Sequence, residues 1–356
     1  MPPVSLVQQA RRRMDELVKR AIGLAEQKTK PMSSVPWKTD EPWKQPWHLY
    51  SQGKRQWEAV ESGPARPPNP AHPIKRIALY SWNIDFMLPF SGSRMRAAVR
   101  HLEGLVQHDR QRDESIAAVI FLQECVESDL TLLASDIWVQ NNFFLTDTST
   151  TDWQSGHYGT TTLIDKRLRI QDLFRVHYEK TRMQRDGLFV DIALSIDSDG
   201  ENKPIRLCNT HLESLALEPP LRPAQVELCA KYMHAPGIAF AAVAGDFNAI
   251  QDFDKTLHSD NNLHDAYLET GGSEDDADGG HTWGQQAATA QRERFGTSRM
   301  DKAFCCGPAM KCVSFERFGA GVELEDEKER EMVVELGFDK PWITDHLGVK
   351  TIFEVV

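Results

Sequence analysis

The sequence predicts an α/β fold, and three observations point to this class. Apolar runs such as 238–244 are long enough for strands that are buried on both faces, as in sheets covered by helices. Segments with helical periodicity, among them 94–106 and 222–233, lie between these runs. Polar side chains follow several of the runs, and in α/β sheets ligands bind at the ends of strands.

Length and composition set the broad class of the protein. The 356 residues suffice for one large α/β domain or two ordinary ones, and a hydrophobic content of 40% supports a substantial core. No apolar run approaches the roughly 20 residues of a membrane span, and the first residues lack the apolar block of a secretory signal. Cysteines without C-x-x-C spacing predict reduced thiols in or near the core, in an intracellular protein, and not a zinc site. They are Cys125, Cys208, Cys229, Cys305, Cys306 and Cys312.

The charge of the chain restricts its partners. A net charge of −11 argues against binding of duplex nucleic acid over the whole surface, because that mode needs a basic face. A local groove that takes the end of a nucleic-acid strand is compatible with this charge. The acidic segments 273–278 and 323–327 are predicted to be solvated loops.

We divide the chain into an N-terminal helix and arm, residues 1–74, and a globular domain, residues 75–356. Apolar side chains at steps of three and four from Val7 to Leu24 indicate a helix with a narrow apolar face. We expect it to dock on the domain or to form a short coil. A basic organelle presequence is the alternative, but acidic residues within the helix weigh against it.

The arm between Pro31 and Pro70 is rich in proline and contains four tryptophans. This composition indicates an extended segment whose indoles dock on a surface, not an independent core. Segments 47–50 and 56–60 are candidates for a small hairpin around Gly53.

The globular domain reads as strands and helices in alternation. Predicted strands are 77–82, 119–122, 157–164, 168–176, 188–196, 205–208, 238–244, 300–304 and 347–353, and predicted helices are 94–106, 128–138 and 222–233. We expect 157–164 and 168–176 to be strands of one meander. Ser128 is the expected N-cap of its helix, and Gly245 is expected to let the chain turn where its strand ends.

Polar groups gather at the ends of five predicted strands. They are Asn83 and Asp85; Glu124; Asn209, His211 and Glu213; Asp246 and Asn248; and Asp345 and His346. Each group alone is compatible with a cap, a turn or a satisfied core polar residue. Together they indicate a cation, because buried carboxylates are costly unless they are paired or bind metal. Oxygen ligands without thiols suit Mg²⁺ or Mn²⁺, and two histidines beside such a metal suit a phosphate ester.

The order of these motifs resembles the endonuclease/exonuclease/phosphatase superfamily. The matching segments are 82–85, 122–124, 209–214, 245–248, 299–301 and 345–348. The resemblance implies a four-layer sandwich, in which two packed mixed β-sheets are flanked by helices, and hydrolysis of phosphate esters with Mg²⁺. Within the superfamily, segments 81–85, 209–214 and 281–283 are most similar to the tyrosyl-DNA phosphodiesterase 2 family, which removes a topoisomerase-derived tyrosine from a DNA 5′ end.

The resemblance implies a role for each motif residue. Glu124 is expected to be the main Mg²⁺ ligand, with Asp85 and Asp345 close by. Asp246 is expected to deprotonate the attacking water, which Asn248 holds in line. The side chains expected to contact the non-bridging oxygens are those of Asn83, His211 and His346. Asp301 is expected to hold the ring of His346; a salt bridge to Arg299 or Lys302 is the alternative.

The predicted substrate is a DNA 5′ end, bound by a monomer in the nucleus or cytoplasm. Ser214 is expected to donate to phosphate, and Trp283, Phe247, Met87 and Leu88 are candidates to stack on nucleotides. A core position is the alternative for Trp283, and Arg182 and Arg185 either contact the phosphate backbone or face water. The chain departs from the tyrosyl-DNA phosphodiesterase pattern at Phe86, Ala249 and Gly284.

Two other functions are compatible with the sequence. One is a different phosphodiesterase of the superfamily, acting on abasic sites, RNA ends or lipids. The other is an inactive scaffold that binds a partner through the tryptophan-rich arm. The complete set of costly polar groups argues against the scaffold.

Overall fold

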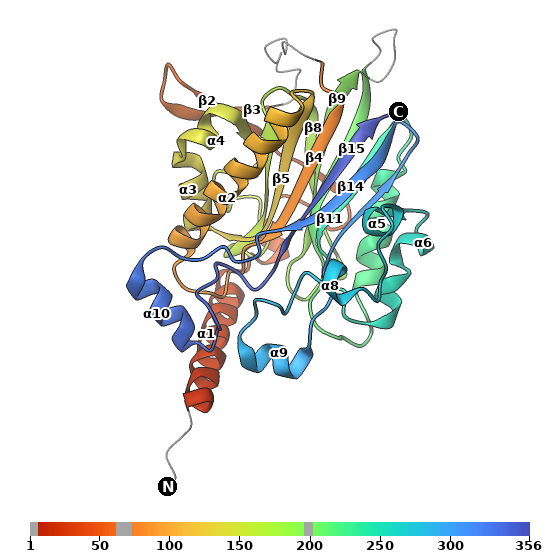
Figure 1. Cartoon of the computed structure of the whole chain (residues 1–356). Helices are drawn as coiled ribbons and strands as arrows, with labels where there is room; N and C mark the ends of the chain where they lie inside the picture. The colour runs from red at the N-terminus through yellow and green to blue at the C-terminus, as the bar shows by residue number, and fades with distance from the viewer. Residues whose placement is uncertain (1–5, 62–72, 196–201) are drawn as a thin grey trace.

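Two β-sheets form the centre of the protein in the computed structural model, which describes residues 6–61, 73–195 and 202–356 (Figure 1). Within these residues one sheet has seven strands in the order β1-β8-β9-β10-β11-β13-β12. Its strands are β1 (Pro42–Lys44), β8 (Arg169–His177), β9 (Asp186–Ser195), β10 (Asn202–His211), β11 (Phe240–Asp246), β12 (His264–Asp265) and β13 (Asp301–Cys306). The other has eight, in the order β14-β15-β4-β5-β7-β6-β2-β3. They are β2 (Trp47–Ser51), β3 (Gln56–Val60), β4 (Arg76–Asn83), β5 (Ile116–Val126), β6 (Phe143–Leu145), β7 (Tyr158–Asp165), β14 (Met310–Phe318) and β15 (Gly348–Val355).

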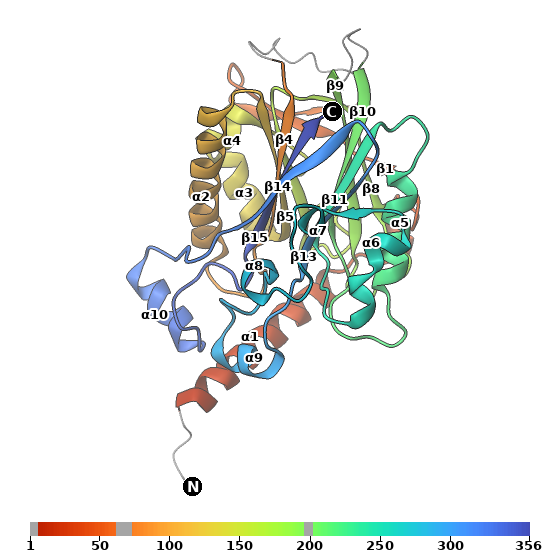
Figure 2. The same cartoon turned by 45° about the vertical axis from the view of Figure 1, so that its right-hand side comes forward.

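Helices surround both sheets. They are α1 (Leu6–Lys28), α2 (Ser91–Arg112), α3 (Glu127–Ser135), α4 (Ile137–Asn142), α5 (Arg222–Met233), α6 (Leu257–Asp260), α7 (Ala266–Glu269), α8 (Ala277–Gly280), α9 (Thr289–Phe295) and α10 (Glu327–Glu335), with short 3-10 turns η1 (Met32–Ser34) and η2 (Asp252–Lys255). Figures 1 and 2 show α2, α3 and α4 on one side of the sheets and α5 and α6 on the other. No helix among the described residues is long and apolar enough to cross a membrane.

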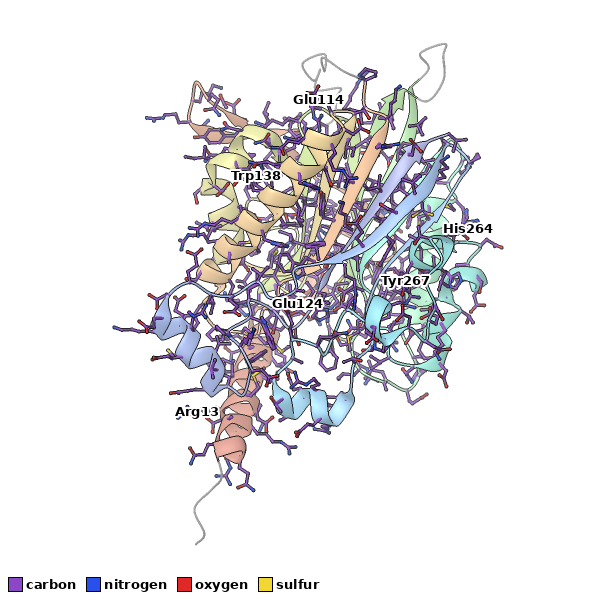
Figure 3. The ribbon with its side chains drawn as sticks, in the orientation of Figure 1. Arg13, Glu114, Glu124, Trp138, His264 and Tyr267 are labelled. Atoms are coloured by element: carbon purple, nitrogen blue, oxygen red, sulfur yellow. The ribbon has the colours of Figure 1, made fainter. Side chains whose placement is uncertain are left out.

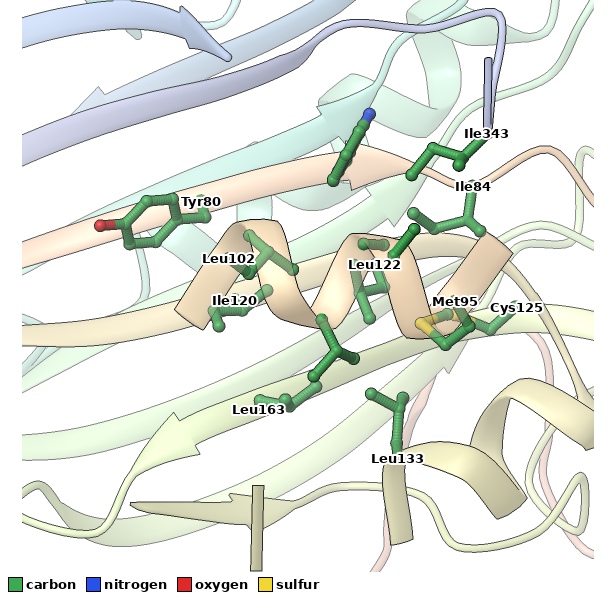
Figure 4. Packing of buried hydrophobic residues seen from close by; sticks show 14 of the residues in the cluster. Tyr80, Ile84, Met95, Leu102, Ile120, Leu122, Cys125, Leu133, Leu163 and Ile343 are labelled. Atoms are coloured by element: carbon green, nitrogen blue, oxygen red, sulfur yellow. The ribbon is translucent and has the colours of Figure 1, made fainter. Parts of the chain in front are cut away.

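Three apolar cores separate the layers and confirm the predicted four-layer sandwich. The alternation of β5 shows how they arise: Ile120 and Leu122 pack in the core that contains α2, whereas Val119 and Phe121 pack between the two sheets. Because successive side chains of a strand point to opposite faces, a strand covered on both faces has an unbroken apolar sequence. Figure 4 shows Leu102 of α2 among these residues. A third core lies between the seven-stranded sheet and α5.

Parallel pairing brings the polar strand ends together. β10 and β11 run parallel with His211 opposite Asp246, and β4 and β5 run parallel with Asn83 opposite Gln123. The carboxyl ends of all four strands therefore meet at one end of the sandwich. Figure 3 shows Glu124 at this end.

The N-terminal segment contributes strands to both sheets. β1 pairs with β8, and the predicted hairpin is confirmed as β2 and β3, which join the other sheet through β6. Trp37 and Trp47 are buried. Helix α1 docks on the domain through Met14, Leu17 and Val18, as expected. The boundary at residue 74 stays a prediction.

Several local predictions were wrong. β7 and β8 belong to different sheets and form no meander, because a turn after Asp165 carries the chain from one sheet to the other. Ser128 is not the N-cap, because it lies inside α3. Strand β5 continues to Val126, which is the N-cap, and Asp129 accepts a hydrogen bond from the backbone N–H of Val126. The strand continues past Gly245, where a Cβ atom would lie 1.7 Å from the carbonyl oxygen of Thr210. Close strand packing, not a turn, therefore requires this glycine.

Candidate active site

Asp246 lies at the centre of the polar strand ends. The Asn83 amide donates to its Oδ2 atom over 2.9 Å, and His211 Nε2 and His346 Nε2 lie 3.3 Å and 3.7 Å from the same atom. Burial raises the pKa of Asp246, but the two imidazoles and the backbone N–H of Asn248 outweigh this effect and hold the pKa below its usual value. The carboxylate is therefore ionised at neutral pH, as a general base must be.

His346 is paired with Asp301. Its Nδ1 lies 2.9 Å from Asp301 Oδ2. The alternative partners bind elsewhere: Arg299 donates to Asp265, and Lys302 donates to Glu274. Burial lowers the pKa of His346, but Asp301 and Asp246 outweigh it and raise the pKa well above its usual value. His346 is thus a cation whose Nε2–H faces Asp246.

These ion pairs also correct the prediction for segment 273–278. Glu274 accepts hydrogen bonds from both Arg299 and Lys302, so this part of the segment is not a free solvated loop. Asp276 caps α8 by accepting from the backbone N–H of Gly279.

His211 has a different partner, Arg185. The guanidinium Nη1 lies 2.6 Å from His211 Nδ1. Because a guanidinium can only donate, Nδ1 accepts and the ring proton is placed on Nε2, toward Asp246. Arg185 also donates to Ser214 Oγ over 3.1 Å and is buried, so it does not face water.

Three more carboxylates lie beside this group. Glu124 accepts from the Asn83 amide over 3.2 Å and from the backbone N–H of Phe86 over 2.9 Å, and Asp345 accepts from Trp283 Nε1 over 2.7 Å. Burial raises the pKa of Asp85 well above its usual value, and repulsion from Asp345 and Glu124 adds to the effect. Burial raises the pKa of Asp345 as well, although His346 opposes it.

The backbone of the site is strained. Asp85, Glu124 and Asn248 have φ angles of 57°, 59° and 49°, in the left-handed region that most side chains avoid. Such residues cost about 1–3 kcal/mol each and persist where the surrounding structure fixes them, most often at functional sites.

The carboxylates fit a divalent cation. Asp85, Glu124 and Asp345 offer buried oxygen atoms and repel one another, which a bound cation would relieve. Oxygen donors without thiols match Mg²⁺ or Mn²⁺. Among the described residues, side-chain atoms of Glu124, His211 and Asp246 lie close enough to share one ion, as do those of Asp246, Asp301 and His346; Asp85 and Asp345 belong to neither group.

Some predicted residues lie outside the site. Phe247 is buried and packs edge-on against Phe304 at 4.7 Å in the core under α5, so it is closed to a nucleotide. Leu88 is likewise buried. Asn209 bonds to Gln123 between the sheets, and Glu213 accepts from Thr181 and from the Arg182 backbone.

Other predicted residues border the site. Trp283 is buried against Asp345, Met87 and Ser214 are half-buried, and the side chain of Arg182 is exposed. The Asn248 amide donates to the carbonyl of Leu212 over 3.0 Å, which joins the ends of β10 and β11.

The unusual residues of the motifs have structural reasons. Phe86 stacks on Tyr158 with 4.2 Å between ring centroids and an 11° tilt. Gly284 has a φ angle of 102°, and a Cβ atom there would lie 2.5 Å from the carbonyl oxygen of Gly296. A larger side chain at position 284 would therefore clash with the loop that follows α9. Ala249 packs at the edge of the core under α5.

The sequence pattern does not indicate two buried arginines that support the site. Arg94 donates to the carbonyls of Asp85, Leu88 and Ile343, so it joins the loops that carry Asp85 and Asp345. Its only sequence signal is a charge at the start of an apolar helix face.

The second buried arginine is Arg222. It pairs with Asp254 at 2.7 Å and donates to the carbonyl of Leu215 over 2.8 Å. Asp254 in turn accepts from the backbone N–H of Ile250 over 3.0 Å. The pair therefore connects the loops that follow His211 and Asn248.

Solved structures share this fold at low sequence identity. A structure of zebrafish (D. rerio) TDP2 humanized by 14 mutations is 20% identical, covers 78% of this chain and 99% of its own, and has a TM-score of 0.58. D. rerio TDP2 complexed with a single-strand DNA product is 19% identical, with 78% and 99% covered and a TM-score of 0.56. The mannosyl-6-phosphatase Bt3783 of Bacteroides thetaiotaomicron is 15% identical, with 79% and 99% covered and a TM-score of 0.53. No curated protein matches the chain in sequence.

The sequence profile of one family spans the whole site. The Endonuclease/Exonuclease/phosphatase family profile matches residues 80–346, from β4 to His346. Members of this family are hydrolases of phosphate esters that generally depend on divalent metals, which agrees with the cluster of acidic and histidine side chains. The chain belongs to the Endonuclease/Exonuclease/phosphatase family.

Proposed function

We propose that the protein is a Mg²⁺-dependent phosphodiesterase that hydrolyses 5′-tyrosyl-DNA bonds in DNA repair, in the nucleus or the cytoplasm. Mn²⁺ is the expected substitute for Mg²⁺. The observation that carries the proposal is the convergence of His211, Asp246 and His346 beside the carboxylates of Asp85, Glu124 and Asp345. The similarity of motifs 81–85, 209–214 and 281–283 to tyrosyl-DNA phosphodiesterase 2, and the TDP2 structures with this fold, support the choice of substrate.

In this proposal the chain places one water molecule and one phosphate. Asp246, ionised and held by Asn83 and by the Asn248 N–H, takes the proton of the attacking water. His346 and His211 each present Nε2–H toward the same point and donate to the non-bridging oxygens, whose charge grows in the transition state. Asp85, Glu124 and Asp345 would hold the cation, which when bound polarises a phosphoryl oxygen and stabilises the leaving oxygen.

A tyrosyl leaving group suits this arrangement. A phenol has a pKa of about 10, far below that of an alcohol, so its departure needs less protonation. Asp301 holds Nδ1 of His346, and the Nε2–H of His346 is assigned to a non-bridging oxygen, so neither proton is assigned to the leaving oxygen. We therefore assign no general acid to the departing oxygen; a cation held by Asp85, Glu124 and Asp345 would supply its stabilisation.

The test is release of tyrosine from a 5′-phosphotyrosyl oligonucleotide, with Mg²⁺ and with EDTA. An abasic duplex, a 5′-phosphorylated RNA and bis(p-nitrophenyl) phosphate serve as competing substrates. Mg²⁺-dependent cleavage of the tyrosyl end above the others is the expected result. Turnover of the small diester alone would leave the catalytic assignment in place and overturn the DNA-end assignment.

A further inference from the structure

We propose that helix α1 is a binding surface for the single-stranded nucleic acid that leads into the active site. In this proposal Arg20 and Lys28 of α1, and Arg182 of the adjoining loop, contact phosphate groups of the nucleic acid. The inference rests on the proposed function, because it extends the path of the DNA strand beyond the site.

Helix α1 packs on the core at the end of the sandwich that carries the site. Leu17 and Val18 join the core that contains Ile84 and Ile343, the neighbours of Asp85 and the Asp345 loop. At its beginning, Arg13 forms an exposed ion pair with Glu335 of α10. Figures 1 and 2 show α1 extending across this end of the sandwich.

The two residues that follow α1 contact two further loops of the site. The backbone N–H of Lys30 donates to Gln154 over 3.0 Å, and Thr29 Oγ1 donates to Gln184 Oε1 over 3.3 Å. A Cβ atom on Gly156 would lie 2.4 Å from the carbonyl oxygen of Lys28, so the loop approaches the helix too closely for any side chain there. Helix and loops thus form one wall.

A short chain of contacts joins Lys28 to the predicted metal ligand. The carbonyl oxygen of Lys28 lies against Gly156, the residue before His157. The rings of His157 and Phe86 meet edge to face at 6.0 Å, and the Phe86 N–H donates to Glu124. A strand bound in the site would therefore leave it beside Lys28.

The charge of α1 is opposite to that of the whole protein. The helix has six Arg or Lys residues and three Asp or Glu residues, a net charge of +3, whereas the chain carries −11. Steps of seven and eight residues place Arg13, Arg20 and Lys28 on one flank. In the part of the chain that the structure describes, no carboxylate forms an ion pair with Arg20 or Lys28. The other flank mixes Arg12 and Lys19 with acidic residues.

Helix α1 lies before the segment that matches the family. The family match begins at residue 80, and the TDP2 structures cover 78% of the chain. A basic helix at the end of the sandwich that carries the site gives an acidic protein a local phosphate-binding surface, without a basic face elsewhere.

The test measures binding of a single-stranded oligonucleotide of about 16 nucleotides in EDTA, by fluorescence anisotropy over a range of salt. The variant Arg20→Ala/Lys28→Ala is compared with the matched control Arg12→Ala/Lys19→Ala. Loss of two phosphate contacts is expected to reduce the slope of log affinity against log salt by about 1.4. The control is expected to keep the wild-type slope, and both variants to hydrolyse bis(p-nitrophenyl) phosphate at the wild-type rate.

Each other outcome overturns the inference in a distinguishable way. Wild-type affinity and slope in Arg20→Ala/Lys28→Ala, together with normal tyrosine release, would refute the role of α1 and leave the proposed function in place. Failure of the wild-type protein both to bind the oligonucleotide and to release tyrosine would refute both. If the variant instead lost binding to phosphatidylserine vesicles with its DNA slope unchanged, α1 would be a membrane contact and the inference would be wrong.

Discussion

His346 Nδ1 lies 2.9 Å from Asp301 Oδ2, and this contact sets the charge of the imidazole that faces Asp246. Asp301 is buried, and its backbone N–H donates to Thr282 Oγ1 over 2.9 Å, which fixes the backbone that carries the carboxylate. The contact gives His346 the role of a fixed cation, and it makes the pH dependence of the enzyme testable.

Asp301→Asn is expected to lower kcat by about 10² to 10³-fold, the usual effect of removing one preorganised donor at a developing charge. Because Asp301 is the strongest influence that raises the pKa of His346, its loss shifts that pKa downward. The alkaline limb of the kcat profile therefore moves to lower pH. A rate profile of the variant with an unshifted alkaline limb would contradict this role.

Glu124→Ala and Asp246→Asn are expected to abolish hydrolysis with folding unchanged. The first removes the main predicted metal ligand and the second removes the base. Circular dichroism and Tm of each variant, measured with the rate on the tyrosyl oligonucleotide, separate lost chemistry from lost structure. Activity retained in both variants would refute the mechanism.

Mg²⁺ is expected to stabilise the fold, and more so at higher pH. The pKa values of Asp85 and Asp345 are raised in the folded protein, so without metal their contribution is fully present below the unfolded pKa and is lost as pH rises through the folded pKa. Mg²⁺ at a hundred times its Kd adds about 2.7 kcal/mol. Tm is measured at pH 5 and pH 8 in EDTA and in Mg²⁺, with Glu124→Gln as the control. A Tm independent of Mg²⁺ at both pH values would count against the site.

His177 is expected to make the protein acid-sensitive. It is buried and stacks on Trp37 at 4.2 Å, and burial lowers its pKa to about 3. Because the unfolded histidine has a pKa of about 6.5, stability is present above that value and is lost as pH falls; by pH 5 the loss is about 2 kcal/mol. Urea unfolding of His177→Phe between pH 7 and pH 5 is expected to show less of this loss. An identical pH dependence in the variant and the wild type would contradict it.

Gly245→Ala tests the close packing of β10 and β11. The added methyl would lie 1.7 Å from the Thr210 carbonyl oxygen, between two backbones that cannot both move. We expect a loss of at least about 3 kcal/mol, or failure to fold. Gly53→Ala, at a position with no neighbour within 4 Å, is the control. A variant at Gly245 with wild-type stability would show that the strands separate more easily than the structure implies.

The sequence indicated the polar residues at the strand ends because a strand buried on both faces is a continuous apolar run. The run stops where the polar residues begin. The same alternation explains one failure. Asp246, the last residue of β11, points into the site, so Phe247 after it points into the core. The sequence does not indicate which sheet β7 and β8 join, since β7 and the second half of β8 are buried on both faces.

The supporting roles of Arg94 and Arg222 could not be predicted from the sequence for a different reason. Most of their partners are backbone carbonyls, and a hydrogen bond to the backbone leaves no pattern of residue types in the sequence. The sequence allowed Asp301 to pair with His346 or with a neighbouring cation such as Arg299. In the structure Asp265 and Glu274 bind Arg299, which leaves Asp301 to His346.

The most direct test of the central claim is single-turnover release of tyrosine from a 5′-phosphotyrosyl oligonucleotide by wild type and Asp246→Asn, at saturating Mg²⁺. The account predicts rapid release by the wild type, none in EDTA, and a rate for Asp246→Asn that is lower by at least about 10²-fold. Equal rates for the two proteins, or release that persists in EDTA, would contradict it.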